Sequence, residues 1–272
     1  MVASLAPDVV STLQEGRQAY IAVDAQDGPH VTPELYAWSG GALWFAVAST
    51  TLKAKVLARR SSSGVLVSAQ GRSIVLGGHI EVVDPRDLRR LPHMVRRLPE
   101  TLPAVARYTV RNAPDLVAFV GDLVTGKLGW RLPPARVLLR FEPARLVVLE
   151  GDTLVAHGAW PAATTDFDST LPAGGQPAVA AMPGPFAVPG RWFEDEQRLH
   201  LAAGLRGLVD GSDWFPMSVV LDDYAAPGPA AKQGTLRRGR GRLPAGSHYV
   251  ECELDKAVTW DGIETTTTAT VA

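Results

Sequence analysis

Short apolar runs separated by turn residues dominate the first part of the chain. Residues 17–48 contain three runs rich in Val, Tyr, Trp and Phe, broken by Asp-Gly-Pro at 27–29 and Ser-Gly-Gly at 39–41. Such runs at short spacing are typical of a β-meander. Two further apolar runs, 64–70 and 73–84, continue the pattern. We therefore expect five successive strands before residue 85.

Helical patterns interrupt the strands at a few places. A short helix is expected near 8–15, and Asp84 offers an N-cap with Pro85 at the first helical position of a second helix, which Pro92 interrupts. More helix is expected between 102 and 126, and residues 135–151 return to a strand pattern. The chain is thus predicted to be mainly β with helical insertions.

The sequence also repeats itself. Segment 158–176 has no period and is rich in Pro, Gly, Ser, Thr and Asp, which indicates a linker. A shift of 156 positions, without a gap, superposes Ala22, Val23, Ala25, Gly28, Pro29, Pro33, Leu43 and Ala46 on Ala178, Val179, Ala181, Gly184, Pro185, Pro189, Leu199 and Ala202. With a gap, Gly78 comes near Gly239. We expect two copies of one β-meander, with limits 1–157, 158–176 and 177–272.

Composition narrows the functional classes. The 272 residues are 46% hydrophobic and 20% charged with a formal charge of −1, which fits a globular protein and argues against one that coats nucleic acid. The single Cys252 cannot form an internal disulfide. No export signal precedes the first strand and no run approaches the roughly 18 apolar residues of a membrane span. We expect a cytoplasmic protein with no membrane or nucleic-acid partner.

A cluster of hydroxyl and ammonium groups follows the third apolar run. Only five of the 27 basic residues are lysines, yet Lys53 and Lys55 come directly after Ser49, Thr50 and Thr51. Hydroxyls and lysines at a strand end suit a phosphate dianion, because the first donate hydrogen bonds and the second supply charge. The alternative is a helix whose basic side chains only face water.

Other candidate sites are weaker. In a strand, Arg238, Arg240 and Arg242 would share one face and could bind a polyanion, or could simply keep an edge strand soluble. The segment 121–128 resembles a P-loop but has Leu128 in place of the Ser or Thr that binds magnesium. The six histidines include no close pair with metal-ligand spacing, so no metal site is expected.

The order of these motifs over residues 14 to 150 resembles the flavin-binding split β-barrel family typified by pyridoxamine phosphate oxidase. The resemblance rests on the strand 19–38, the run 43–49, the Ser/Thr–Lys segment, and the strands 65–70 and 77–84. It implies a split barrel that binds FMN at a dimer interface. Some members use the deazaflavin F420, bind haem or have lost the cofactor.

The resemblance also implies site residues. Thr50, Thr51 and Lys53, flanked by Ser49 and Lys55, would meet the cofactor phosphate. The isoalloxazine ring would lie against His30, Val31, Thr32 and Pro33, beside the strand with Gly77 and Gly78. One departure is that Val56-Leu57 leads into Arg59 and Arg60, where an Asn/Asp-Pro turn is usual.

The duplication suggests that one chain supplies both halves of such a dimer, as a monomeric pseudo-dimer or a homodimer of these. The second copy has no lysine at 202–216, so one cofactor site is expected, with Arg238 and Arg240 adding anion contacts. The leading function is FMN-dependent hydride transfer to a small-molecule substrate, with the catalytic residues unknown. Alternatives are an F420-dependent reductase, a non-catalytic flavin or haem binder, and a cofactor-free scaffold.

Overall fold

The computed structural model describes residues 5–84, 86, 91–114, 117, 135–151, 153–158, 174–201, 213–222, 233–244, 247, 249–261 and 264–269. Strands predominate, and the helices are α1 (Pro7–Glu15), α2 (Leu52–Leu57) and α3 (Leu91–Arg111). None of these helices is long and apolar enough to cross a bilayer. The predicted linker lies almost entirely outside the described residues, as do the P-loop-like segment and residues 202–212.

The first sheet has seven strands in the order β3-β2-β1-β4-β5-β6-β7, and a β3–β6 pairing closes six of them into a barrel. Its strands are β1 (Gln18–Ala25), β2 (Gly28–Ser39), β3 (Ala42–Ala48), β4 (Ser62–Ala69), β5 (Arg72–Val83), β6 (Arg136–Glu150) and β7 (Thr153–Gly158). The five strands predicted before residue 85 are therefore confirmed.

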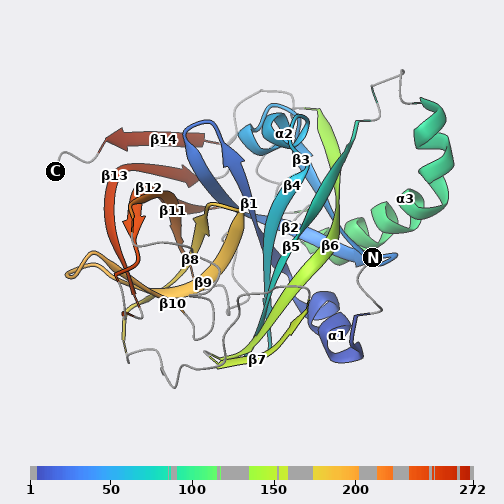
Figure 1. Cartoon of the computed structure of the whole chain (residues 1–272). Coiled ribbons are helices and arrows are strands. Elements are labelled where there is room, and N and C mark those ends of the chain that lie inside the picture. The colour runs from blue at the N-terminus through green and yellow to red at the C-terminus, as the bar shows by residue number, and fades with distance from the viewer. Residues whose placement is uncertain are drawn as a thin grey trace. The chain divides into compact units, whose positions relative to one another are not determined.

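The second sheet repeats this topology. Its order is β10-β9-β8-β11-β12-β13-β14, closed by a β10–β13 pairing, and Figure 1 shows these strands curling together. The strands are β8 (Gln176–Met182), β9 (Phe186–Phe193), β10 (Arg198–Leu201), β11 (Phe215–Leu221), β12 (Gln233–Arg242), β13 (Tyr249–Asp261) and β14 (Glu264–Ala269). Two barrels of one topology confirm the predicted duplicated split-barrel fold.

The repeat is in register at the first hairpin turn and shifts at the second. Gly28 and Gly184 occupy matching turns with φ of 106° and 125°, a backbone region that favours glycine. Tyr36 pairs with Phe45, however, whereas Trp192 pairs with Leu199. Eight residues separate Tyr36 from Phe45 but only six separate Trp192 from Leu199, so the second hairpin is two residues shorter and Leu199 takes the place of Phe45. The gap-free match of Leu199 with Leu43 was wrong.

The helix starts and the position of β12 can be compared with the remaining sequence predictions. α1 begins at Pro7, as a proline at the first helical position favours. The helix expected after Asp84 is α3, which begins at Leu91. Asp84 does not cap it, because its carboxylate accepts a hydrogen bond from the backbone N–H of Arg86 in a turn. β12 lies between β11 and β13. The alternative that its arginines protect an edge strand is therefore wrong.

The chain divides into two compact units that cut across the barrels. The first unit comprises Met1–Glu34, Ser62–Gly78 and Pro143–Ala272, and the second comprises Leu35–Ser61 and His79–Glu142. In the first unit, strands of both sheets share one buried cluster, which includes Tyr20, Leu66, Val75, Ala178, Trp192 and Val250. The first unit thus contains part of the packing between the two barrels.

That packing is reciprocal. A Cβ added at Gly28, in the β1–β2 turn, would lie 2.9 Å from Cβ of Pro216 on β11. A Cβ added at Gly64, on β4, would lie 2.5 Å from the carbonyl oxygen of Pro185 in the β8–β9 turn. The first turn of each barrel therefore meets the fourth strand of the other, which is the pattern of an isologous dimer interface. Within this unit the two copies pack as an intramolecular pseudo-dimer.

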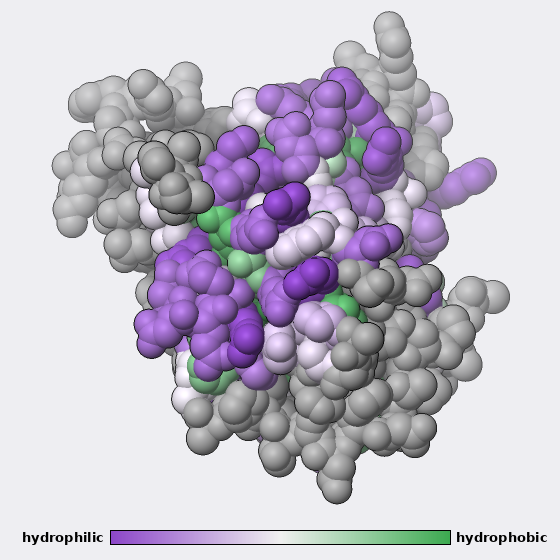
Figure 2. Space-filling model, turned by 60° about the vertical axis from the view of Figure 1, so that its left-hand side comes forward, coloured by the Kyte–Doolittle hydropathy of each residue, from purple (hydrophilic) through white to green (hydrophobic). Residues whose placement is uncertain are grey.

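The surface is polar where Figure 2 displays it. Hydrophilic residues cover most of the coloured part of this face, with small hydrophobic areas between them. This is the expected counterpart of a core that takes up the large apolar side chains of the strands.

Candidate functional site

The segment predicted to bind phosphate lies in the second unit, between β3 and α2. Thr51 is the N-cap of α2: its Oγ1 accepts a hydrogen bond from the backbone N–H of Ala54 at 3.4 Å and donates one to the carbonyl of Ala48 at 2.8 Å. Capping satisfies a helix N–H that has no partner inside the helix. The Thr51 hydroxyl thus uses its single proton in the hydrogen bond to Ala48, so it can only accept further hydrogen bonds.

Burial separates the two lysines. Lys53 is 5% exposed, and desolvation lowers its pKa from 10.5 to about 7, because burial disfavours the charged form. Lys55, in the last turn of α2, is exposed, and so is Thr50. The donors that face solvent are therefore Thr50 and Lys55, while Lys53 lies beneath the surface with a titration near neutral pH.

The closing strands of the barrel anchor this segment. The N–H of Ser49 donates to the carbonyl of Ala135 at 2.9 Å, and Nη1 of Arg136 donates to the carbonyl of Ala46 at 2.9 Å. Both contacts extend the β3–β6 pairing that closes the first barrel. The predicted phosphate segment is thus held by one main-chain hydrogen bond from Ser49, and the strand before it by one side-chain hydrogen bond from Arg136.

The residues predicted to approach a flavin ring lie on β2, in the first unit. His30 and Thr32 are half-buried, while Val31 and Pro33 are buried, as strand alternation requires. Val31 belongs to the core cluster shared by both sheets. One side of the strand thus carries half-buried polar residues, although Nδ1 of His30 is itself buried, and its other side packs.

The matching stretch of the second barrel is closed. Phe186 to Pro189, which follow residues 30–33 by 156 positions, are all buried. Phe186 takes the place of His30, and the Arg145 guanidinium lies 6.0 Å from its ring centroid. An apolar ring thus fills the position where the first barrel has a half-buried imidazole, so the two copies differ at this strand.

Gly77 and Gly78 lie on β5, where both are buried. They belong to the first unit, with residues 30–33, whereas residues 49–55 belong to the second. The structure therefore places the predicted ring residues and the predicted phosphate residues in different units.

Two of the three arginines predicted to share one face of β12 form ion pairs with their neighbours on β13. Arg240 and Arg242 stand directly opposite Glu253 and Glu251 and form ion pairs with them at 2.6 and 2.5 Å. Both guanidiniums also lie near the Trp214 ring, at 4.9 and 5.2 Å from its centroid. Opposite charges across strands stabilise a sheet. These arginines therefore have a structural role in the second barrel.

Arg238 differs from them. Its Nη2 donates to the main-chain carbonyl of Asp27, 2.9 Å away in the β1–β2 turn. The residue opposite it on β13 is Lys256, which is also a cation. Of the predicted anion-binding arginines, Arg238 is the one that reaches the first barrel, immediately before the strand with His30.

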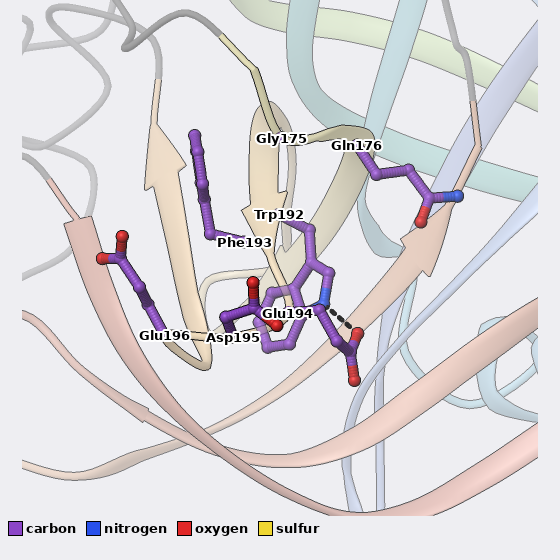
Figure 3. A pocket seen from close by; sticks show the side chains of 7 residues that line it. All are labelled: Gly175, Gln176, Trp192, Phe193, Glu194, Asp195 and Glu196. Atoms are coloured by element: carbon purple, nitrogen blue, oxygen red, sulfur yellow. Dashed lines mark hydrogen bonds between the residues drawn. The ribbon is translucent and has the colours of Figure 1, made fainter.

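Sequence reasoning missed a pocket at the β9–β10 turn. A cavity of about 300 Å³ is lined by Trp192, Phe193 and the acidic turn that follows, seen in Figure 3. Trp192 Nε1 donates to Glu194 at 2.6 Å, and Arg237 Nη1 lies 2.7 Å from both oxygens of this carboxylate. These hydrogen bonds, with that of Arg237 foremost, lower the pKa of Glu194. The acidic run 194–196 was its sequence signal, and none of the predicted site residues lines it.

The family model described as pyridoxamine 5'-phosphate oxidase matches residues 6–128. Over these residues the chain is similar to this family. The match contains all the predicted site residues of the first barrel, from His30 to Gly78, and ends before Arg238 and Arg240. The resemblance stated from the sequence is confirmed for this part of the chain.

Solved structures similar to this chain cover about half of it. A protein named F420 reductase shares 20% identity over 50% of this chain and 93% of its own, with a TM-score of 0.33. A conserved hypothetical protein from Mycobacterium tuberculosis shares 20% identity over 56% of this chain and 87% of its own, with a TM-score of 0.38. An FAD-binding protein from Mesorhizobium loti shares 18% identity over 54% of this chain and 94% of its own, with a TM-score of 0.34. At these scores no conclusion is drawn from them, and no curated protein matches the chain.

Proposed function

We propose that this chain binds one flavin-type cofactor, FMN first and F420 as the alternative, and uses it as an oxidoreductase. The observation that carries the proposal is the asymmetry of the two barrels. β2 keeps His30 and Thr32 half-buried in a segment of the flavin-enzyme family, whereas the matching Phe186 and Val188 are buried. The accessible polar strand belongs to the first barrel, which supports a single site there.

The residues present fit the two ends of FMN, each within its own unit. A phosphate needs donors that face solvent, and the segment 50–55 provides the exposed hydroxyl of Thr50 and the exposed ammonium of Lys55. A flat ring needs a strand that side chains have not sealed, and His30 and Thr32 leave such a strand on β2. These residues would hold the phosphate and orient the ring.

Bound FMN would supply hydride transfer through its N5 atom. The side chains of this chain would then bind, orient and exclude water rather than act as acid or base. Val31 and Pro33 fix β2 by packing. Gly77 and Gly78 place no side chain at their two positions on β5. The buried Lys53 would supply charge when protonated.

The proposal also covers the organisation of the protein. We place the first barrel at 1–157, the linker at 158–176 and the degenerate second barrel at 177–272. The second barrel would take the place of the partner subunit, so the working form is a pseudo-dimeric monomer or a pair of them. The substrate would be a small molecule, and the compartment the cytoplasm.

Absorbance and titration test this function. The purified protein is titrated with FMN, F420 and haem, and each is followed by its own absorption or fluorescence. We expect one FMN or F420 per chain and a weaker affinity in Thr50→Ala, with Thr109→Ala on α3 as the hydroxyl control. Two equivalent sites would refute the asymmetric site, a Soret band would favour haem, and no uptake would refute cofactor binding.

A further inference from the structure

We infer that Arg238 of the second barrel is a positioning residue for strand 30–33 of the first barrel. It would act by holding the β1–β2 turn, and its effect on cofactor affinity rests on the proposed function. Arg238 and the turn lie in the same compact unit, 211 positions apart in the chain. The second barrel would thereby complete a site whose other residues come from the first.

The contact is made at the last residue of the turn, directly before β2 begins at Gly28. Nη2 of Arg238 donates to the carbonyl of Asp27 at 2.9 Å, and a hydrogen bond from a charged donor is about twice as strong as a neutral one. Gly28 follows with φ of 106° and packs so closely on Pro216 that a side chain there would collide. Asp27 and its neighbour Gly28 thus contact β12 and β11 of the second barrel, respectively.

Strand alternation explains why Arg238 points at the turn. Met217 faces the interior of the second barrel, since its sulfur lies 3.6 Å from the Cys252 thiol. Pro216 and Ser218, on either side of Met217, therefore face outward, and Arg238 stands directly opposite Ser218 on the same face. Ser218 is fully buried, and its hydroxyl has no hydrogen-bond partner among the described residues. The outward face is therefore covered at Ser218, whereas Pro216 is exposed.

The opposite half of the pseudo-symmetric interface is built differently, and there the Arg145 guanidinium lies 6.0 Å from the Phe186 ring centroid. There, Gly64 lets the main chain of Pro185 and Phe186 approach β4, and Phe186 seals its own strand. The hydrogen bond from Arg238 to Asp27 thus occurs on the side where His30 and Thr32 of the following strand are half-buried.

Arg238→Ala tests the inference, with Arg238→Lys as the conservative variant and Arg237→Ala as the matched control. Arg237 precedes Arg238 on β12, and it binds Glu194 within the second barrel instead of the turn. Amide hydrogen exchange of a peptide covering 24–33 and the dissociation constant for FMN are measured. For Arg238→Ala we expect exchange of this peptide and the dissociation constant each to rise about fivefold, with partial recovery in the lysine variant and little change in the control.

The outcomes separate the inference from the proposed function. Unchanged exchange in Arg238→Ala would overturn the inference, and so would faster exchange with unchanged FMN affinity. If the wild-type chain takes up neither FMN nor F420, the proposed function fails, and the exchange of the turn peptide alone decides whether Arg238 positions the strand. If Arg238→Ala does not fold, the lysine variant must show an intermediate rise in exchange, or the inference fails.

Discussion

Replacing Lys53 by methionine would test the burial of its ammonium group. Methionine has a similar length and no charge, so the variant removes the titration and keeps most of the packing. In the folded protein burial lowers the Lys53 pKa to about 7, while the unfolded chain protonates near 10.5. Between these values the unfolded state binds a proton that the folded state does not, so stability rises with pH in this window.

The magnitude follows from the two pKa values. The full shift corresponds to at most about 5 kcal/mol, at about 1.4 kcal/mol per pH unit. Burial raises the pKa of Cys252 from 9.0 to about 12, which lowers stability above pH 9, so the clean window is pH 7 to 9. Across it, Lys53 should raise the free energy of unfolding by about 2 kcal/mol. Lys53→Met should be more stable than wild type at pH 7 by roughly 2–4 kcal/mol.

Urea denaturation at pH 7, 8 and 9 measures this free energy. Wild type should gain stability across the series, and Lys53→Met should lose that slope. Lys55→Met is the control, because it removes an exposed ammonium from the same helix and should keep the wild-type slope. A methionine variant that is less stable at pH 7 and retains the slope would show that Lys53 is charged and stabilised in the fold, and the reasoning would be wrong.

Three further predictions concern binding and packing. FMN affinity should fall from pH 7 to 9 if its phosphate needs protonated Lys53, which a calorimetric titration in wild type and Lys53→Met would detect; equal pH dependence in both would exclude this link. Ser218→Ala should raise stability by about 1 kcal/mol, because it removes a buried hydroxyl with no partner among the described residues; a loss of 1 kcal/mol or more in thermal unfolding would contradict this. Gly28→Ala should cost roughly 1–3 kcal/mol in urea denaturation, since it combines positive φ with a collision against Pro216. Gly71→Ala, at φ of 75° with open space around it, should cost less, and equal losses would remove the role of Pro216.

Much of the fold could be predicted from local patterns. The turns at Gly28 and Gly40, the alternation of His30 to Pro33 and the helix start at Thr51 depend on backbone preferences of a few neighbouring residues. The duplication was also visible, because turn glycines and prolines recur at one spacing. The gap-free match failed at the hairpin after β9, which is two residues shorter than its counterpart and so shifts the pairing of Leu199 by two positions.

The character of the candidate site was decided by tertiary packing. Sequence alone presented Lys53 and Lys55 as equals, and likewise Arg238 and Arg240. Folding buries Lys53 and exposes Lys55, and it pairs Arg240 with Glu253 while Arg238 reaches Asp27, 211 residues away. Side-chain type and spacing set which strands form and which face each residue takes. The depth of an ammonium and the partner of a guanidinium depend on which distant strands pack against them, and no local pattern encodes that.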